Sequence, residues 1–367
     1  MLKLRFSVGT SGSQHFNAYQ AIQTYRYFLD DKYYAWNGSS LIAMGNPDLK
    51  WQQKRDYNIG LDVKLWDNRI TIGGDFYIAK TNDLISTLTL PAANGFTTYI
   101  ENIGSLKNTG YELRLSAYVL RKDQMSWSVS LAGIHNKNKI VEVSQALLDA
   151  QNAIESEDLV NPNVQFRPGY SSNTIWTVRS AGIDPGTGKE VFISRDGNRT
   201  YNWSASDIVA TGVSDPKLEG NISSMFRYKG LSLNVSFGYR FGGQIYNSTL
   251  ANKVEVSKTA IGWNVDARVF HDRWKNIGDQ ASFKGLDDFT PTNKTSRFVQ
   301  DETTFRCQNM TLQYELKSQA LNKLLGIDYC LFSASTSDLF YISTVKRERG
   351  TSYPFSRQFS LGVNVVF

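Results

Sequence analysis

The segment 355–367 alternates apolar and polar side chains along its length. The odd-numbered positions carry Phe355, Phe359, Leu361, Val363, Val365 and Phe367, and also Arg357. The even-numbered positions carry the polar or small residues Ser356, Gln358, Ser360, Gly362 and Asn364. Because successive side chains of a β-strand point to opposite faces, this pattern predicts a strand with one apolar face and one polar face. Such strands are typical of transmembrane β-barrels, with lipid on one side and water or a plug on the other.

The same period of two recurs along the chain and indicates strands rather than helices. In 231–241, for example, apolar or aromatic residues at the odd positions alternate with Ser232, Asn234, Ser236, Gly238 and Arg240. We predict about ten strands of the length that a barrel strand needs. They lie near 1–10, 51–66, 69–82, 106–121, 124–138, 217–229, 231–244, 302–317, 326–338 and 355–367.

The connections between these strands alternate between long and short without a break. The short ones fall at 67–68, 122–123, 230 and 318–325, and the long ones at 11–50, 83–105, 139–216, 245–301 and 339–354. Asp67-Asn68 and Lys229-Gly230 suit tight hairpin turns, because Asn, Asp and Gly tolerate positive backbone φ angles. Bacterial outer-membrane barrels have short periplasmic turns and long extracellular loops. The predicted fold class is therefore all-β, an antiparallel up-and-down transmembrane β-barrel portion.

The composition is compatible with one barrel unit. Only 8 of the 367 residues are proline and no Ser/Gly/Pro-rich linker divides the chain, so we expect no domain boundary. An aromatic content of 13% suits the aromatic girdles of a barrel. The net charge of +6 is scattered and gives no indication of nucleic-acid binding. No apolar run approaches the roughly 20 residues of a spanning helix, and no signal-peptide pattern precedes the first strand.

The chain carries no recognisable catalytic motif. It contains neither a Gly-x-Ser-x-Gly elbow nor a His-Glu-x-x-His pair, so we expect no enzyme activity and no cofactor. His15, His135 and His271 have no neighbours at ligand spacing, so no metal site is predicted. Cys307 and Cys330 would fall at different levels of one hairpin, which favours free thiols over a disulfide.

Several ordered blocks resemble the carboxy-terminal part of SusC/RagA-type TonB-linked outer-membrane transporters. The blocks are Leu-Arg-Phe-Ser-Val-Gly-Thr at 4–10, Asn-Pro-Asp-Leu-Lys-Trp at 46–51, Phe-Tyr at 76–77 with Lys-Thr-Asn-Asp-Leu-Ile at 80–85, Asn-Ile-Gly at 102–104 with Asn-Thr-Gly-Tyr-Glu at 108–112, Ala-Gly-Ile-Asp-Pro at 181–185 with Thr-Gly at 187–188, and Tyr-Pro at 353–354. They stand in the family's order and span nearly the full length, which makes the resemblance specific.

The resemblance implies that 1–367 is the carboxy-terminal part of a plugged barrel of about 22 strands. It also implies uptake of an oligosaccharide or peptide ligand across the outer membrane of a Gram-negative, Bacteroidetes-like bacterium. The implied partners are a SusD-like surface lipoprotein, outer-membrane lipid, and the TonB complex through an amino-terminal part. The family's plug domain, signal peptide and earlier strands have no counterpart here, so we expect a truncated fragment that does not transport alone.

Aromatic residues in the two longest predicted connections are the candidates for ligand contact. Flat aromatic rings stack well on sugar rings and on peptide side chains. The candidates are Trp176, Tyr201, Trp203, Trp263 and Trp274. The alternative is that these rings pack the loops against each other or against the lipoprotein.

Two other functional classes stay open at this point. One is a soluble β-rich carbohydrate-binding module, whose apolar strand face would pack on a second sheet. The other is a self-contained passive porin. The regular alternation of connection lengths argues against the first, and the family blocks argue against the second.

Overall fold

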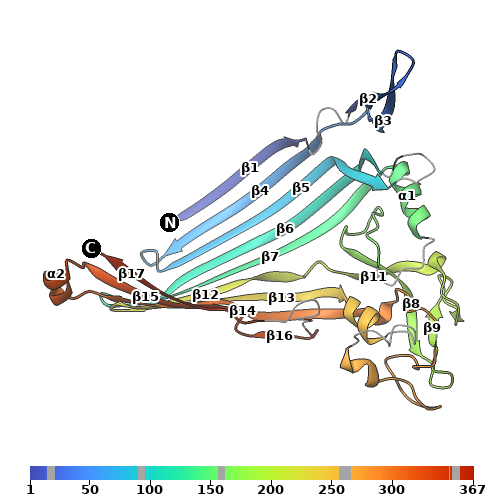
Figure 1. Ribbon diagram of the computed structural model, residues 1–367. Helices are drawn as coiled ribbons and strands as arrows, with labels where there is room; N and C mark the ends of the chain where they lie inside the picture. The colour runs from blue at the N-terminus through green and yellow to red at the C-terminus, as the bar shows by residue number, and fades with distance from the viewer. Residues whose placement is uncertain are drawn as a thin grey trace.

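A large antiparallel sheet dominates the computed structural model of the protein (Figure 1). The structure describes residues 1–14, 21–89, 96, 98–155, 162–255, 266–288, 290–346, 348 and 356–367. The sheet has 11 strands, which run in sequence order except that β16 pairs with β14 beside β15. Its strands are β1 (Leu2–Ser13), β4 (Gln52–Leu65), β5 (Ile70–Thr89), β6 (Thr98–Lys122), β7 (Met125–Val143), β12 (Leu218–Tyr228), β13 (Leu231–Tyr246), β14 (Val299–Leu316), β15 (Tyr329–Ser337), β16 (Tyr341–Ser343) and β17 (Phe359–Val366).

Each of the strands predicted from the period of two lies in this sheet, so the predicted antiparallel, up-and-down topology is confirmed. The predicted ends of β5 and β6 are wrong, because both strands continue well into the expected loop 83–105. Register shifts between Thr81 and Leu84 and between Leu84 and Ile85 interrupt the pairing, which then resumes. Asp83 takes a φ of 53° and Gly104 a φ of 138° at this bulge. The strands therefore stay paired past a bulge, beyond the segment in which apolar and polar residues alternate.

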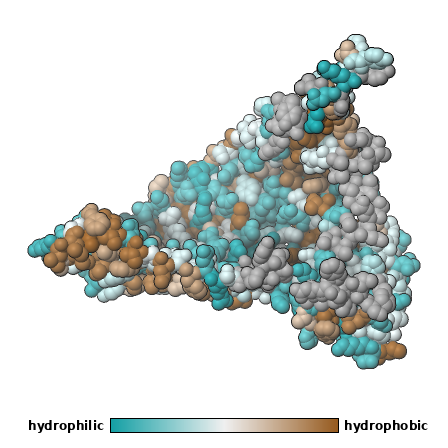
Figure 2. Space-filling view, in the orientation of Figure 1, coloured by the Kyte–Doolittle hydropathy of each residue, from teal (hydrophilic) through white to brown (hydrophobic). Residues whose placement is uncertain are grey.

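Directly opposed residues of an antiparallel pair share a face, so the register assigns every side chain to one side of the sheet. One side is apolar and open: Phe6 is 70% exposed and Leu361 is 87% exposed. Over the described residues, no second sheet packs on this side. The opposite, concave side is hydrophilic, as Figure 2 shows between the upper and the lower strands. The sheet therefore has the two faces of a membrane barrel wall.

The connections sort by length to opposite ends of the sheet. Both chain ends and α2 (Gln319–Leu325) lie at one end, together with the short turns (Figure 1). Asp67, Asn68 and Lys229 have φ angles of 51°, 64° and 48°, as expected for the two predicted hairpins. The long connections lie at the other end and include a two-stranded sheet of β2 (Thr24–Tyr33) and β3 (Trp36–Ala43). The predicted alternation is confirmed.

A second, smaller sheet fills the long connection between β7 and β12. Its order is β10-β9-β8-β11, formed by β8 (Thr174–Ile183), β9 (Glu190–Ile193), β10 (Arg199–Thr200) and β11 (Ile208–Val213). We call it the loop sheet. Its core contains Trp176, Val178, Phe192 and Ile208, with Trp203 packed against them. This connection is therefore a folded unit rather than an irregular loop.

The helices are short and lie outside the large sheet. They are α1 (Gln145–Glu155), α2, the 3₁₀ turns η3 (Ala205–Asp207), η6 (Ala267–Phe270) and η7 (Ser296–Phe298), and the π-helical η4 (Leu250–Val254). Leu147 of α1 packs on Ile103 at the extended end of β6. Within the described ranges, no helix combines the length and the apolar character needed to cross a bilayer. Cys307 and Cys330 are free, as predicted.

We expect a charge on the apolar face to destabilise the membrane-inserted protein. Leu113 lies on this face, opposite Gly74 and Gly133, and is exposed. Leu113→Arg should cost about 2–4 kcal/mol if its position is near the bilayer midplane. Leu113→Phe is the matched control and should retain stability, because lipid accepts its ring. Semi-native electrophoresis after graded heating measures the folded fraction, and equal stability of both variants would contradict a lipid-facing position.

Candidate functional site

Charged and polar side chains form rows across the inner face of the sheet. In one row Arg5 stands opposite Gly60, Gly60 opposite Asp75, and Asp75 opposite Glu112. The row continues through β7, β12, β13 and β14 at Ile134, Glu219, Arg240 and Thr304. Since the strand pairing alone sets this alignment, the inner wall presents both signs of charge at one level.

A buried carboxylate organises the first part of this wall. The Asp75 side chain is 7% exposed and lies 3.0 Å from the Arg5 guanidinium and 2.5 Å from that of Arg114. Arg5 also pairs with Asp62 at 2.8 Å. A Cβ atom at Gly60 would collide with both the Arg5 and the Asp75 side chains. Glycine at this position therefore lets charges on the two flanking strands meet across it.

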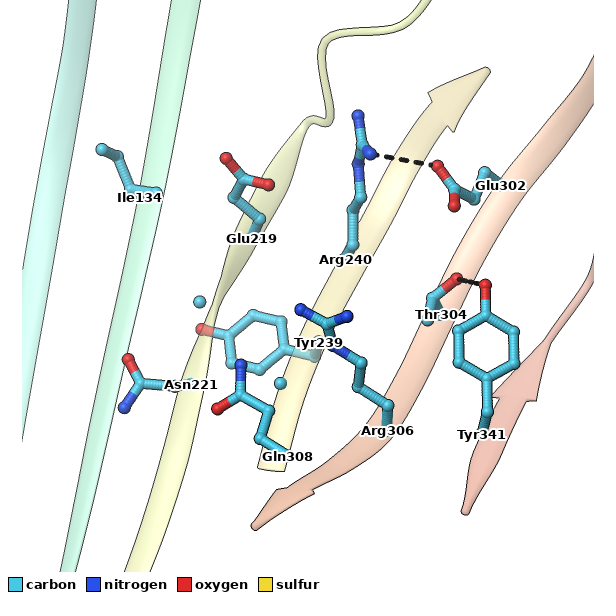
Figure 3. Close-up of a pocket in the computed structure, with 12 residues that line it drawn as sticks. Ile134, Glu219, Asn221, Tyr239, Arg240, Glu302, Thr304, Arg306, Gln308 and Tyr341 are labelled. Carbon is cyan, nitrogen blue, oxygen red and sulfur yellow. Dashed lines mark hydrogen bonds and ion pairs between the residues drawn. The ribbon is translucent and has the colours of Figure 1, made fainter. Parts of the chain in front are cut away.

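A cavity of about 590 Å³ opens on the second part of the wall (Figure 3). Its lining comes from β7, β12, β13, β14 and β16. Arg240 pairs with Glu302 at 3.2 Å, and the Thr304 and Tyr341 hydroxyls lie 3.3 Å apart. Among the described residues, Arg306 makes no ion pair. The cavity therefore presents side chains of both charges together with uncharged polar groups.

Side-chain hydrogen bonds connect β5, β6 and β7 next to the charged row, on the side toward the loop sheet. The Tyr77 hydroxyl donates to Asn136 at 3.1 Å, and the Asn136 amide donates to Asn108 at 3.2 Å. Asn138 also donates to Asn108, at 3.0 Å, and accepts from the Ser172 backbone amide at 2.9 Å. The sequence block at 108–112 therefore contributes to a network that reaches from the wall to the start of the loop sheet.

Further hydrogen bonds fix the loop sheet to the wall. The Ile140 amide donates to the Tyr170 carbonyl at 2.8 Å, and the Val213 amide donates to the Gln244 side chain at 3.0 Å. The Arg240 guanidinium donates to the Ser214 carbonyl. These bonds join the segment just before β8 to β7, and the end of β11 to β13.

Three of the sequence blocks meet at Asn102. Its side-chain oxygen accepts from the Lys50 amide at 2.8 Å, and its amide donates to the Lys50 carbonyl and the Asp83 carbonyl, both at 2.9 Å. Asn46 donates to the Ile100 carbonyl at 3.0 Å. The blocks at 46–51, 80–85 and 102–104 thus lock the long connection before β4 against the extended ends of β5 and β6.

The structure places the predicted ligand residues at different depths. Trp176 is 4% exposed in the loop-sheet core, with Arg167 over its ring, and Trp203 packs against that core. Trp274 donates from its indole to the Pro185 carbonyl at 2.8 Å and lies against Gly188. These three rings make packing contacts within the protein, and their ligand role stays a prediction. Trp263 lies outside the described residues.

Tyr201 is the accessible candidate, with 53% exposure beside a cavity of about 270 Å³. Its hydroxyl donates to Asp184 at 2.8 Å. Hydrogen bonds from the Thr187 hydroxyl, the Gly186 amide and the Tyr201 hydroxyl hold the pKa of Asp184 below its ordinary value. The ionised Asp184 carboxylate in turn raises the pKa of Tyr201. The ring is thus held in place with its face accessible, while its ligand role stays a prediction.

The inner-wall charges and Asn102 were not among the functional residues predicted from the sequence. The alternation of apolar and polar positions along the strands did contain a signal for the inner-wall charges. The polar positions of these amphipathic strands include Arg5, Asp62, Asp75, Glu112 and Arg114. Which of them pair could be read only from the register. In the described part of the chain, no group of three or more metal-ligating side chains is close enough to hold a metal.

We expect Asn102→Ala to loosen the connection before β4. The substitution removes the acceptor for the Lys50 amide and the donors to two carbonyls. Unmade bonds of this kind cost about 1–3 kcal/mol, so the Lys50 amide should exchange its hydrogen faster in hydrogen–deuterium exchange mass spectrometry. Asn102→Asp keeps the acceptor and is the matched control, with smaller change at Lys50. Unchanged exchange in Asn102→Ala would contradict the role of Asn102.

Residues 2–247 match the family described as TonB dependent receptor-like, beta-barrel. Over 426 aligned residues, the chain is 24% identical to TonB-dependent receptor P39 of Formosa agariphila, covering 100% of this chain and 40% of that protein. It is 26% identical to TonB-dependent receptor SusC of Bacteroides thetaiotaomicron over 393 residues, covering 100% of this chain and 37% of SusC. The chain therefore spans about two-fifths of the length of these relatives.

Solved structures share the fold. The RagAB peptide importer in its closed-closed state superposes with a TM-score of 0.80 at 24% identity, covering 99% of this chain and 40% of that one. A second RagAB peptide transporter structure gives a TM-score of 0.79 at 23% identity, with the same coverage. Together with the family match over 2–247, these likenesses show that the chain belongs to the TonB-dependent receptor β-barrel family and is a SusC/RagA-like portion of the barrel.

Proposed function

We propose that the chain forms part of the wall of an outer-membrane transporter that imports nutrients in a Gram-negative bacterium under TonB control. The observation that carries the proposal is a single sheet with an open apolar side and a charged, concave inner side. Membership in the TonB-dependent receptor family supports the transport class and the outer-membrane location.

Lipid explains the apolar side better than a soluble binding module does. In a β-sandwich, the apolar sides of two sheets bury each other. Here large apolar residues remain exposed on β1, β4, β6 and β17, and the loop sheet and helices lie beyond the strand ends. Exposed apolar area of this extent is unfavourable in water by about 25 cal/mol per Å² and is stabilised in hydrocarbon.

The open sheet also favours a larger barrel over a self-contained porin. β1 pairs with β4 and β17 pairs with β15, and over the described residues no hydrogen bond joins β1 to β17. An unpaired backbone group in hydrocarbon costs several kcal/mol, on the order of the penalty for burying a bare amide. We infer that further strands complete the barrel and that this chain does not transport alone.

Family membership supports a proposal for the ligand class and the partners. We infer an oligosaccharide or a peptide as ligand, a SusD-like surface lipoprotein at the extracellular end, and energy from the TonB complex through another part of the receptor. A peptide is the cargo named for the RagAB structures. The Formosa and Bacteroides relatives support a Bacteroidetes-like source. Tyr201, exposed beside its cavity, is the ring that we assign to ligand contact.

Uptake assays on the receptor that contains this chain test the proposal. Cells should accumulate labelled oligosaccharide or peptide at low external concentration, and accumulation should disappear when TonB is deleted or the proton gradient is dissipated. A receptor locus from which only residues 1–367 are expressed is the matched control and should give no uptake. Uptake that persists without TonB and rises linearly with concentration would support the passive porin instead.

Tyr201→Ala should weaken ligand binding by the intact receptor. Loss of an aromatic stacking contact lowers the binding free energy by about 0.5–1.5 kcal/mol in addition to the loss of buried area. This corresponds to roughly a 2- to 12-fold rise in Kd. Tyr201→Phe keeps the ring and loses only the hydrogen bond to Asp184, so it should bind nearly as the parent does. Isothermal titration calorimetry measures both. If the ligand that is taken up binds Tyr201→Ala with unchanged Kd, contact at Tyr201 is excluded and the transport proposal stands.

A further inference from the structure

The turn between β14 and β15 is a helix with two distinct faces. With about 100° between successive residues of a helix, the apolar side chains of α2 gather in one arc and its polar side chains in the opposite arc. The apolar arc contains Ala320, Leu321, Leu324 and Leu325. The polar arc contains Gln319, Asn322 and Lys323. Leu324 is 80% exposed and Leu325 is 61% exposed, so the apolar arc is unpacked.

Asn322 on the polar arc ties the helix to the residue that precedes β15. The Asn322 side chain donates to Asp328 at 2.8 Å, and the Asp328 backbone amide donates to the Val366 carbonyl at 2.7 Å. Gly326 ends the helix with a φ of 68°, and its amide donates to the Asn322 carbonyl at 2.9 Å. The helix is thus tied to β15 and β17 through its polar side, which leaves the leucines free to meet another surface.

The apolar arc continues the apolar side of the large sheet. The last outward row of β14, β15 and β17 consists of Leu316, Cys330 and Val365, and α2 follows directly after it. Figure 2 shows apolar surface gathered at this end of the molecule, where Figure 1 places α2. The neighbouring Glu315 and Lys317 lie on the other parity, where they pair with each other at 2.6 Å.

Aromatic side chains mark the same end of the sheet as a membrane interface. Trp and Tyr concentrate where acyl chains meet headgroups. Exposed aromatics near the short turns are Trp66, Trp127, Tyr228 and Tyr314. This places α2 at or just beyond the headgroup level, which is where an amphipathic helix is stable with its apolar side toward the acyl chains.

We propose that α2 is an interfacial anchor that lies in the plane of the periplasmic leaflet, with Leu324 and Leu325 inserted among phospholipid acyl chains. Lys323, on the polar arc, reaches the phosphate level from there. The occupant is lipid because the exposed arc is continuous with the sheet side that lipid covers, and because Asn322 on the opposite arc is bonded to Asp328 beside β15. The anchor sets the depth of the β14–β15 turn in the membrane.

Spin labels on the full receptor that contains this chain test the anchor. The receptor carries Cys330→Ser and one introduced cysteine, and is reconstituted in phosphatidylethanolamine/phosphatidylglycerol vesicles. The labelled positions are Leu324→Cys, Lys323→Cys as the matched polar-arc control, and Leu312→Cys on the outward side of β14. Power saturation compares collisions with oxygen, which concentrates in lipid, and with a water-soluble nickel complex. The spectrum of the receptor without an introduced cysteine is subtracted.

Labels at 324 and 312 should favour oxygen, and the label at 323 should shift toward nickel. A label at 324 that meets nickel as readily as that at 323, or one that is immobile and shielded from both reagents, overturns the anchor. The inference rests on the proposed membrane location, which the label at 312 tests by itself. If the label at 312 collides mainly with oxygen and the label at 324 mainly with nickel, only the anchor is overturned. If both labels collide mainly with nickel, the membrane location is overturned as well.

Discussion

A backbone amide or carbonyl in hydrocarbon must find its partner within the protein, because lipid offers none. The long antiparallel ladder meets this requirement for the interior strands, and it is the constraint from which the other features follow. Strand pairing aligns the residues in rows, the rows separate into two sides, and the two sides meet different solvents. The apolar rows and the charged rows are thus two results of one hydrogen-bonding pattern.

Within the inner wall, glycine determines where charges meet. Gly60 on β4 leaves space for Arg5 from β1 and Asp75 from β5, so an ion pair forms across an intervening strand. Gly110 acts similarly on β6, because a side chain there would collide with Tyr77. Tyr77 then begins the amide network that reaches Asn138. Gly60 on β4 and Gly110 in the block at 108–112 therefore shape the wall through the space that they leave for neighbouring side chains.

The sequence could predict the strands wherever one side meets lipid and the other meets polar groups, since that contrast produces the period of two. It could not predict the extended ends of β5 and β6, where Ile103 and Ser105 are both buried and the contrast disappears. The same holds for β8, whose residues from Thr174 to Val178 are buried on both sides. Aromatic identity alone also could not separate the buried Trp176 from the exposed Tyr201, because both residue types occur in loops and in cores.

The attachment of the loop sheet to β7 and β13 limits how the loop sheet can move. Hydrogen bonds at Ile140, Val213 and Ser214 hold the chain to the wall just before β8 and at the end of β11, and the strands between them share one core. A movement of the loop sheet relative to β7 and β13 would therefore have to break these hydrogen bonds.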